Sequence, residues 1–303
     1  MVVGTDDQLI PFQLDRSGLR GRVLRLGPTV DHILSRHGHN ERLSALLGEF
    51  VVLGASLAGG LKYEGRFSLQ TRSDGAVRLI VADVTNEGGI RAYASADEER
   101  LDQIDEADFE TMVGKGYLAV TVDQSARGGE TYQGIVELQG SSLADCMLAY
   151  FRQSEQVRTG IAIAVGRDAN GHWRGGGIVI QKLPDENGSA LADREEDWHR
   201  TMLLMSTVAE SELIDPFLDP RRLLWRLFSE EEVRVYEPKT LKAECRCSPE
   251  RIGAMLESFS ADDLDDMADE DGKITITCQF CKQVYRSHRE DPTNVAPLTE
   301  THN

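Results

Sequence analysis

Cysteine is scarce in this 303-residue chain, which has five, and four of them lie after residue 244. Long apolar runs are absent, and none approaches the roughly 20 residues that a membrane-spanning helix needs, so we expect no membrane partner. Positive charge is in deficit, because 33 Lys and Arg face 51 Asp and Glu and give a formal net charge of -18. Such a surface opposes nucleic acid, whose phosphates require a basic partner.

The N-terminal stretch, MVVGTDDQLIPF, lacks the basic and apolar segments of a secretory signal, so we expect a cytoplasmic protein. Thiols stay reduced in the cytoplasm, and closely spaced cysteines there bind metal or serve redox chemistry more often than they form structural disulfides. The composition, with 40% hydrophobic and 28% charged residues, is ordinary for a globular protein. The length suggests one large domain and a smaller one.

Residues 1–185 are predicted to form a sheet-rich α/β body, the larger part of an α+β protein. Alternating apolar residues predict a hairpin over 64–84 that turns near Asp74 and Gly75. A second strand pair is expected at 116–124 and 131–140, with further strands at 160–165 and 175–183, and helices at 29–38, 41–61 and 141–156. The glycine-rich run WRGGGIVI lacks the lysine and helix start of a phosphate-binding loop, and is interpreted as sheet.

Residues 186–232 are predicted to form a helical linker. A polar joint containing Pro184 and Gly188 leads into it. Apolar residues at helical spacing then predict an amphipathic helix; they are Trp198, Met202, Met205 and Val208. A second helix is expected to begin at Asp219 and Pro220, an N-cap followed by proline at the first helical position. Its apolar residues are Leu223, Leu224, Leu227 and Phe228.

Residues 233–303 form the predicted tail, where Cys245 and Cys247 are separated by 30 residues from Cys278 and Cys281. The second pair joins two strand-like segments in KITITCQFCKQVYRS, an arrangement typical of a zinc ribbon. Four thiolates suit a soft ion, zinc before iron-sulfur, and one such set predicts one zinc per chain. The tail has few large apolar side chains, so we expect metal binding to supply most of its folding energy.

Three interpretations of the tail follow from the residues alone. A static zinc ribbon that binds a fixed partner is the first. The second is a redox-sensitive site, because the short Cys-x-Cys spacing lets Cys245 and Cys247 reach each other, and their oxidation would remove metal ligands. The third, a thiol oxidoreductase using Cys278 and Cys281, is disfavoured because that pair joins two strands and does not begin a helix.

Motifs along nearly the whole chain resemble one family. Its body motifs occur in order as LKYEGRFSLQ, DGAVRLIVADV, GKGYLAVTVD, YQGIVELQG, YFRQSEQVRTGIAIAV and GGGIVIQKLP, followed by CRC and CQFC. This pattern is similar to the thirty-three kilodalton heat-shock chaperone family of bacterial zinc-binding holdases. The resemblance implies a redox-regulated, ATP-independent chaperone that is inactive with zinc bound and binds unfolding client proteins after oxidation.

The resemblance also implies two disulfides in the oxidised form, zinc release, and unfolding of the tail and the linker. We expect these disulfides to join Cys245 to Cys247 and Cys278 to Cys281, since the members of each pair are adjacent. A monomer when reduced, a homodimer when oxidised, and hand-off of clients to an ATP-driven chaperone are further implications.

Other candidate residues are assigned to packing or left as secondary hypotheses. Methionine-rich faces adapt to varied partners, so the linker helices supply candidate client-binding residues, although core packing is the commoner role. These candidates are Trp198, Met202, Met205, Leu223 and Leu227. Cys146 is expected to be a small buried hydrophobe, and His37 and His39 to lie in a solvated turn. No catalytic motif is present, so we do not expect an enzyme.

Overall fold

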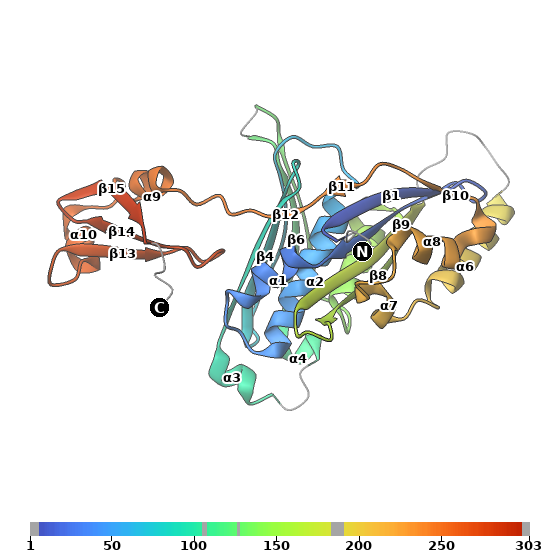
Figure 1. Cartoon of the computed structure of the whole chain (residues 1–303), viewed down its shortest axis with the longest axis horizontal. Helices are drawn as coiled ribbons and strands as arrows, with labels where there is room; N and C mark the ends of the chain where they lie inside the picture. The colour runs from blue at the N-terminus through green and yellow to red at the C-terminus, as the bar shows by residue number, and fades with distance from the viewer. Residues whose placement is uncertain (1–5, 105–107, 126–127, 183–190, 299–303) are drawn as a thin grey trace. The chain divides into compact units, whose positions relative to one another are not determined.

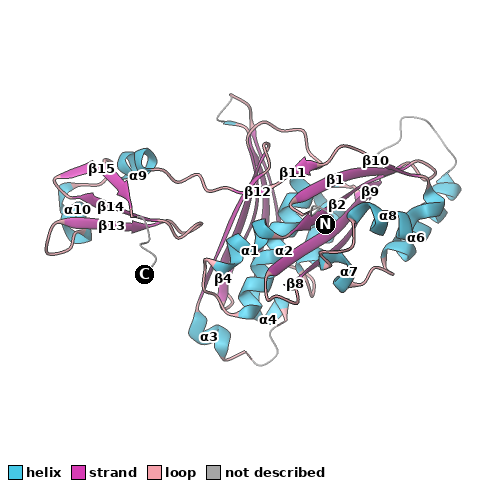
Figure 2. Ribbon diagram, viewed as in Figure 1, coloured by secondary structure: helices cyan, strands magenta, loops and turns pink. Residues whose placement is uncertain are grey.

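The computed structural model describes residues 6–104, 108–125, 128–182 and 191–298, with backbone alone at 191–194. The chain divides into two compact units, Met1–Ala243 and Glu244–Asn303 (Figure 1). Strands dominate the first unit, and helices and a small sheet make up the second (Figure 2). The predicted α+β class is confirmed. Among the described helices, none combines the length and the apolar character needed to cross a membrane.

One six-stranded sheet of the first unit is antiparallel, in the order β10-β1-β2-β9-β8, with β11 also paired to β1. Its strands are β1 (Gln8–Leu14), β2 (Leu19–Leu26), β8 (Arg158–Arg167), β9 (Trp173–Lys182), β10 (Val233–Val235) and β11 (Lys239–Thr240). The strands expected at 160–165 and 175–183 are therefore confirmed. Strands β1 and β2, which continue the sheet beyond β9, were not predicted from the sequence.

The second six-stranded sheet has the order β12-β5-β4-β3-β6-β7, and only its β12–β5 pair is parallel. Its strands are β3 (Arg66–Ser73), β4 (Val77–Thr85), β5 (Gly89–Ala96), β6 (Gly116–Asp123), β7 (Thr131–Glu137) and β12 (Lys242–Ala243). The β3–β4 hairpin turns at the predicted Asp74 and Gly75, and the predicted β6–β7 pair is present. Short helices α3 (Glu98–Asp102) and α4 (Phe109–Val113) lie between β5 and β6 in the chain.

Helix α2 (Glu41–Ala58) is the centre of the main core and contacts strands of both sheets. It is apolar on nearly every side, as a helix enclosed by protein must be. The Asn40 side chain caps it by accepting a hydrogen bond from the Leu43 backbone at 3.0 Å. Helix α1 (Pro28–Ser35) precedes it. Helix α5 (Leu143–Tyr150) continues into a π-helical turn (Phe151–Glu155). Its Cys146 is fully buried, which confirms that prediction, and burial raises the pKa of the thiol.

The glycine run of β9 lets neighbouring elements approach the sheet closely. A Cβ atom on Gly176 would collide with the backbone of Leu213, which lies on α7 (Glu210–Ile214). A Cβ atom on Gly175 would lie 2.6 Å from a methyl group of Val52 on α2. The interpretation of this run as sheet is confirmed, and its glycines fit the close packing on β9.

The predicted helical linker consists of α6 (Leu191–Met205), α7 and α8 (Pro220–Phe228), followed by a 3-10 turn (Ser229–Glu231). Asp219 and Pro220 begin α8 as predicted, and the Asp219 carboxylate accepts from the Arg221 backbone at 2.7 Å. The polar joint with Pro184 and Gly188 lies outside the described residues. Apolar side chains of α6 and α8 pack in a second core with residues of the first sheet, among them Ile10, Phe12, Ile178 and Ile180.

Residues 233–243, assigned to the tail from sequence, form β10, β11 and β12 in the first unit. The physical reason is backbone pairing with β1 and β5, together with Leu241, which is only 4% exposed in the main core. Strands this short carry almost no alternation of apolar and polar residues, so the sequence gives little sign of them.

The second unit contains α9 (Pro249–Leu256), α10 (Ala261–Met267) and a sheet in the order β13-β14-β15. The three strands are β13 (Lys273–Thr277), β14 (Val284–His288) and β15 (Asp291–Pro297). Part of the acidic run forms α10, where Ser260 and Asp263 make a capping box at the positive end of the helix dipole. Among residues 244–298, the buried apolar core consists of Ile252, Leu256, Leu264, Ile274 and Tyr285.

Because of Glu49, we expect the free energy of unfolding of the first unit to depend on pH. Burial, and secondly the nearby Glu210, raise the pKa of this α2 carboxyl group from 4.5 to about 7. The native state therefore holds this proton more tightly than the unfolded state. The stabilisation is complete below about pH 4.5 and is lost as the pH rises through about 7. Glu49→Gln should raise the free energy of unfolding at pH 8 and give less gain at pH 5.

Urea unfolding followed by tryptophan fluorescence measures the free energy of unfolding of the first unit, since Trp173, Trp198 and Trp225 all lie in it. Glu87→Gln is the matched control, because Glu87 is exposed and the substitution removes the same charge. An equal gain for Glu49→Gln at both pH values would contradict the assignment of the raised pKa to Glu49.

Candidate metal centre

The turn between β13 and β14 positions Cys278 and Cys281. The Lys282 backbone N–H donates to the Cys278 carbonyl at 2.9 Å, and the Cys278 N–H donates to the Gln283 carbonyl at 2.9 Å. Lys282 has a positive φ of 58°, which reverses the chain immediately after the second cysteine. The two strands pair antiparallel from Lys273 to Thr277, so the predicted knuckle between two strands is confirmed.

Cys245 and Cys247 lie on the extended segment between β12 and α9. Ser248 caps α9 by accepting from the Arg251 backbone at 3.3 Å. The Arg251 guanidinium in turn donates to the Arg246 carbonyl at 2.9 Å, between the two cysteines. The helix start thus fixes the segment that bears the first pair.

The four cysteines converge. Their Sγ atoms all lie within 4.8 Å of one another, and Cys245 to Cys278 is 3.6 Å and Cys247 to Cys281 is 3.4 Å. None of the four is in a disulfide bond, and all four are partly buried. A tetrahedral zinc with Zn–S bonds of 2.3 Å requires sulfurs about 3.8 Å apart. The donor set and its spacing fit zinc, and each of the four predicted cysteines would supply one ligand.

The electrostatics of the cluster suit a cation. Burial, and then the neighbouring Cys247 and Cys245, raise the pKa of the Cys281 thiol, while a backbone hydrogen bond at Gln283 opposes the shift. Four thiolates this close repel one another, so a bound dication would favour the deprotonated form and neutralise two of the four charges.

Tyr285 is a residue of the site that sequence reasoning missed. It lies on β14, is 4% exposed, and its hydroxyl group donates to Cys247 Sγ at 3.2 Å. The alternation of apolar and polar residues along this strand is a signal that Tyr285 is buried. Nothing in the sequence indicated that its partner would be a cysteine of the first pair. The hydrogen bond orients the Cys247 ligand from the opposite half of the site.

Removing this hydroxyl group should weaken metal binding without unfolding the unit. Loss of an outer partner of a metal ligand typically costs 10–100-fold in affinity, so Tyr285→Phe should lower zinc affinity at least about tenfold. Competition with a chromogenic chelator measures this. Tyr117→Phe, an exposed position in the first unit, is the control and should leave the affinity unchanged. Equal affinity of wild type and Tyr285→Phe would show that the hydroxyl group is dispensable.

The structure places the five candidate client-binding residues inside the second core of the first unit. Met205, Leu223 and Leu227 are 7%, 1% and 4% exposed, and Trp198 and Met202 are partly buried against the same core. They share this core with strands of the first sheet, so Met205, Leu223 and Leu227 are covered in the intact unit, while Trp198 and Met202 stay partly accessible. His37 and His39 stack with ring centroids 5.3 Å apart, and the His39 side chain is only 10% exposed, so the prediction of a solvated turn is wrong.

The protein therefore consists of a sheet-rich first unit and a small second unit whose four clustered cysteines could hold a metal ion. The model of the family described as Hsp33 protein matches residues 7–288. The 33 kDa chaperonin of Caulobacter vibrioides is 40% identical over 288 residues, covering 93% of this chain and 94% of that protein. Those of Ectopseudomonas mendocina and Salmonella typhi are 34% and 33% identical, and each alignment covers at least 90% of both chains.

The crystal structure of the 33 kDa chaperonin of Thermotoga maritima has the same fold. It superposes with a TM-score of 0.79 at 22% identity, covering 94% of this chain and 96% of that one. The chain belongs to the Hsp33 family of chaperones.

Proposed function

We propose that this chain is a redox-regulated, ATP-independent holdase whose four cysteines bind one zinc ion in the reduced, inactive form. The observation that carries the proposal is the convergence of four cysteines, none of them in a disulfide, to within 4.8 Å in a unit whose described residues form a core of five buried apolar side chains. Membership in the chaperone family supports client binding, and the small core supports a unit that depends on its metal.

Oxidation would remove the ligands. For each pair of thiolates, one hydrogen peroxide accepts two electrons and, with two protons from the solvent, is reduced to two water molecules as one disulfide forms, so two peroxide molecules are needed for two disulfides. We assign the disulfides to Cys245–Cys247 and Cys278–Cys281, which close the shortest loops. The shortest sulfur contacts run instead from Cys245 to Cys278 and from Cys247 to Cys281, so peptide mapping of the oxidised protein must decide between these pairings.

Client binding would then require the linker helices to separate from the first sheet. Trp198, Met202, Met205, Leu223 and Leu227 remain the candidate residues, because separation of α6 and α8 would expose them together with the sheet residues beneath. In the same proposal, the reduced protein is a cytoplasmic monomer, the oxidised protein is a homodimer, and clients pass to an ATP-driven chaperone.

The experiment combines three measurements on one sample, namely zinc release, thiol titration, and light scattering of a chemically unfolded client diluted into the protein. Peroxide should release one zinc, consume four thiols, and confer suppression of aggregation without ATP. Cys146→Ser should behave as wild type, because Cys146 is buried away from the cluster in the first unit. A protein that keeps its zinc under peroxide and never suppresses aggregation would be a static zinc ribbon.

A further inference from the structure

A large cavity lies wholly in the first unit, between its two sheets, and none of its lining residues belongs to the cysteine cluster. Its volume is about 920 Å³, within the range of small-molecule sites. The end of α2, strands β1 and β2, strands β3 and β6, and the π-helical turn all contribute to its walls. π-Helical turns are frequent at functional sites.

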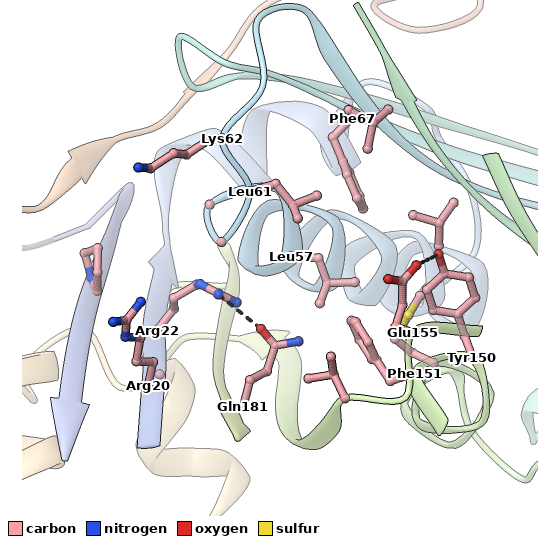
Figure 3. A pocket seen from close by; sticks show the side chains of 18 of the residues that line it. Arg20, Arg22, Leu57, Leu61, Lys62, Phe67, Tyr150, Phe151, Glu155 and Gln181 are labelled. Atoms are coloured by element: carbon pink, nitrogen blue, oxygen red, sulfur yellow. Dashed lines mark hydrogen bonds between the residues drawn. The ribbon is translucent and has the colours of Figure 1, made fainter. Parts of the chain in front are cut away.

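The middle of the cavity is apolar. Figure 3 shows Leu57 from the end of α2, Leu61 from the turn that follows, and the rings of Phe67 and Phe151 around the same space. Further apolar residues of the lining are Pro11, Phe12, Val120, Val122, Met147 and Val157. Such a surface favours a hydrocarbon chain over a polar ligand.

One side of the cavity is basic, with Arg20, Arg22 and Lys62 gathered there (Figure 3). Arg22 is partly buried and donates to the Gln181 side-chain oxygen at 3.1 Å, a neutral partner. Within the described part of the chain it makes no ion pair. Burial lowers its pKa to about 10, so the guanidinium is still charged at neutral pH. A partly desolvated cation without a counter-charge favours binding of an anion.

The carboxylate of the cavity does not neutralise this cation. Glu155 lies on the far side in Figure 3, where Tyr132 and Tyr150 both donate to its Oε1 atom at 2.7 Å. The two hydroxyl groups satisfy that oxygen locally. The cavity therefore has a basic end, an apolar middle, and a remote polar end whose charge is already hydrogen-bonded.

Gly60 leaves room for the Arg22 side chain. A Cβ atom at Gly60 would collide with the guanidinium group, so the side chain lies directly against the turn that follows α2. This contact fixes the guanidinium beside the apolar residues at the end of the helix.

We propose that this cavity binds a single-chain amphiphile with an anionic head group, the head at Arg22 and the hydrocarbon chain along Leu57, Phe67 and Phe151. A carboxylate and a phosphate monoester both match the planar donor pair of arginine. The site is independent of the cysteine cluster, so the proposal stands or falls separately from redox regulation.

The test uses the reduced, zinc-loaded full chain and calorimetric titration with monomeric myristate, tetradecyl phosphate and tetradecanol. Both anions should bind, the tighter one identifying the preferred head group, and tetradecanol should bind at least about tenfold more weakly. Laurate should bind roughly tenfold more weakly than myristate, since each buried methylene contributes about the same increment. Absence of binding, or equal binding of myristate and tetradecanol, would overturn the proposal.

Variants locate the head group. Arg22→Gln should weaken myristate binding about tenfold or more and leave tetradecanol binding unchanged. Arg72→Gln removes the same charge from an exposed position outside the cavity and should have no effect. Gly60→Ala keeps the charge but displaces the guanidinium, so it should also weaken myristate binding if Arg22→Gln proves unstable. If neither Arg22→Gln nor Gly60→Ala changed myristate affinity, or if Arg72→Gln lowered it as much as they do, myristate binding would be non-specific.

Discussion

Cys278→Ser should unfold residues from Glu244 onward and leave the first unit folded. Apparent zinc binding free energies in small zinc domains are on the order of 10–16 kcal/mol, and this unit has only five buried core residues to hold it without metal. The first unit has two cores of its own, and neither includes a residue of the second unit. Hydrogen exchange should therefore show loss of protection across the helices and strands of the second unit, α9, α10, β13, β14 and β15, and not in the first unit.

Two controls define this result. Cys146→Ser changes a buried cysteine of the first unit and should leave zinc stoichiometry at one per chain. Chelation of zinc from the reduced wild type should reproduce the exchange pattern of Cys278→Ser. If either treatment unfolded the whole chain in one transition, as followed by the three tryptophans of the first unit, the two units would not be independent.

Leu223→Ser should give a protein that suppresses client aggregation while reduced and zinc-loaded. Leu223 lies on the buried face of α8 and is 1% exposed, and truncating a buried leucine costs about 2–5 kcal/mol, with a further cost for the buried hydroxyl group. The loosened helix would expose the apolar residues that it shares with the first sheet. Light scattering of a diluted, chemically unfolded client measures the gain in activity.

Leu203→Ser is the matched control, because Leu203 lies on α6 but is 56% exposed. It should leave both stability and activity unchanged. Hydrogen exchange must first show that α8 has loosened in Leu223→Ser. A loosened but inactive variant would place the client surface away from the faces of α6 and α8, and the unfolded second unit would become the candidate.

The sequence predicted those parts of the fold whose signal is local. The Asp74–Gly75 hairpin, the Asp219–Pro220 helix start and the Cys-x-x-Cys knuckle each depend on neighbouring residues, and all three are present. The four cysteines could be grouped from spacing because few ligand sets have that pattern. Their approach to within 4.8 Å is a property of the folded unit that spacing alone does not give.

Features that depend on distant partners were missed. Strands β11 and β12 are two residues long and exist because β1 and β5 offer free edges. The contact of Tyr285 with Cys247 joins residues 38 positions apart. The linker helices showed their apolar faces in the sequence, but nothing in their periodicity identified the first sheet as the surface beneath them.

The short strands β11 and β12 attach the chain to the first unit immediately before the second unit begins. Consecutive segments of the chain pair with different sheets, with the buried Leu241 between them, and the first cysteine follows β12 after a single residue. An unfolded chain of the sixty residues from Glu244 would reach only about 40 Å on average. The four cysteines would stay at high local concentration because they belong to one short chain segment. After reduction of the disulfides, refolding of the second unit should therefore proceed at a rate that is independent of protein concentration.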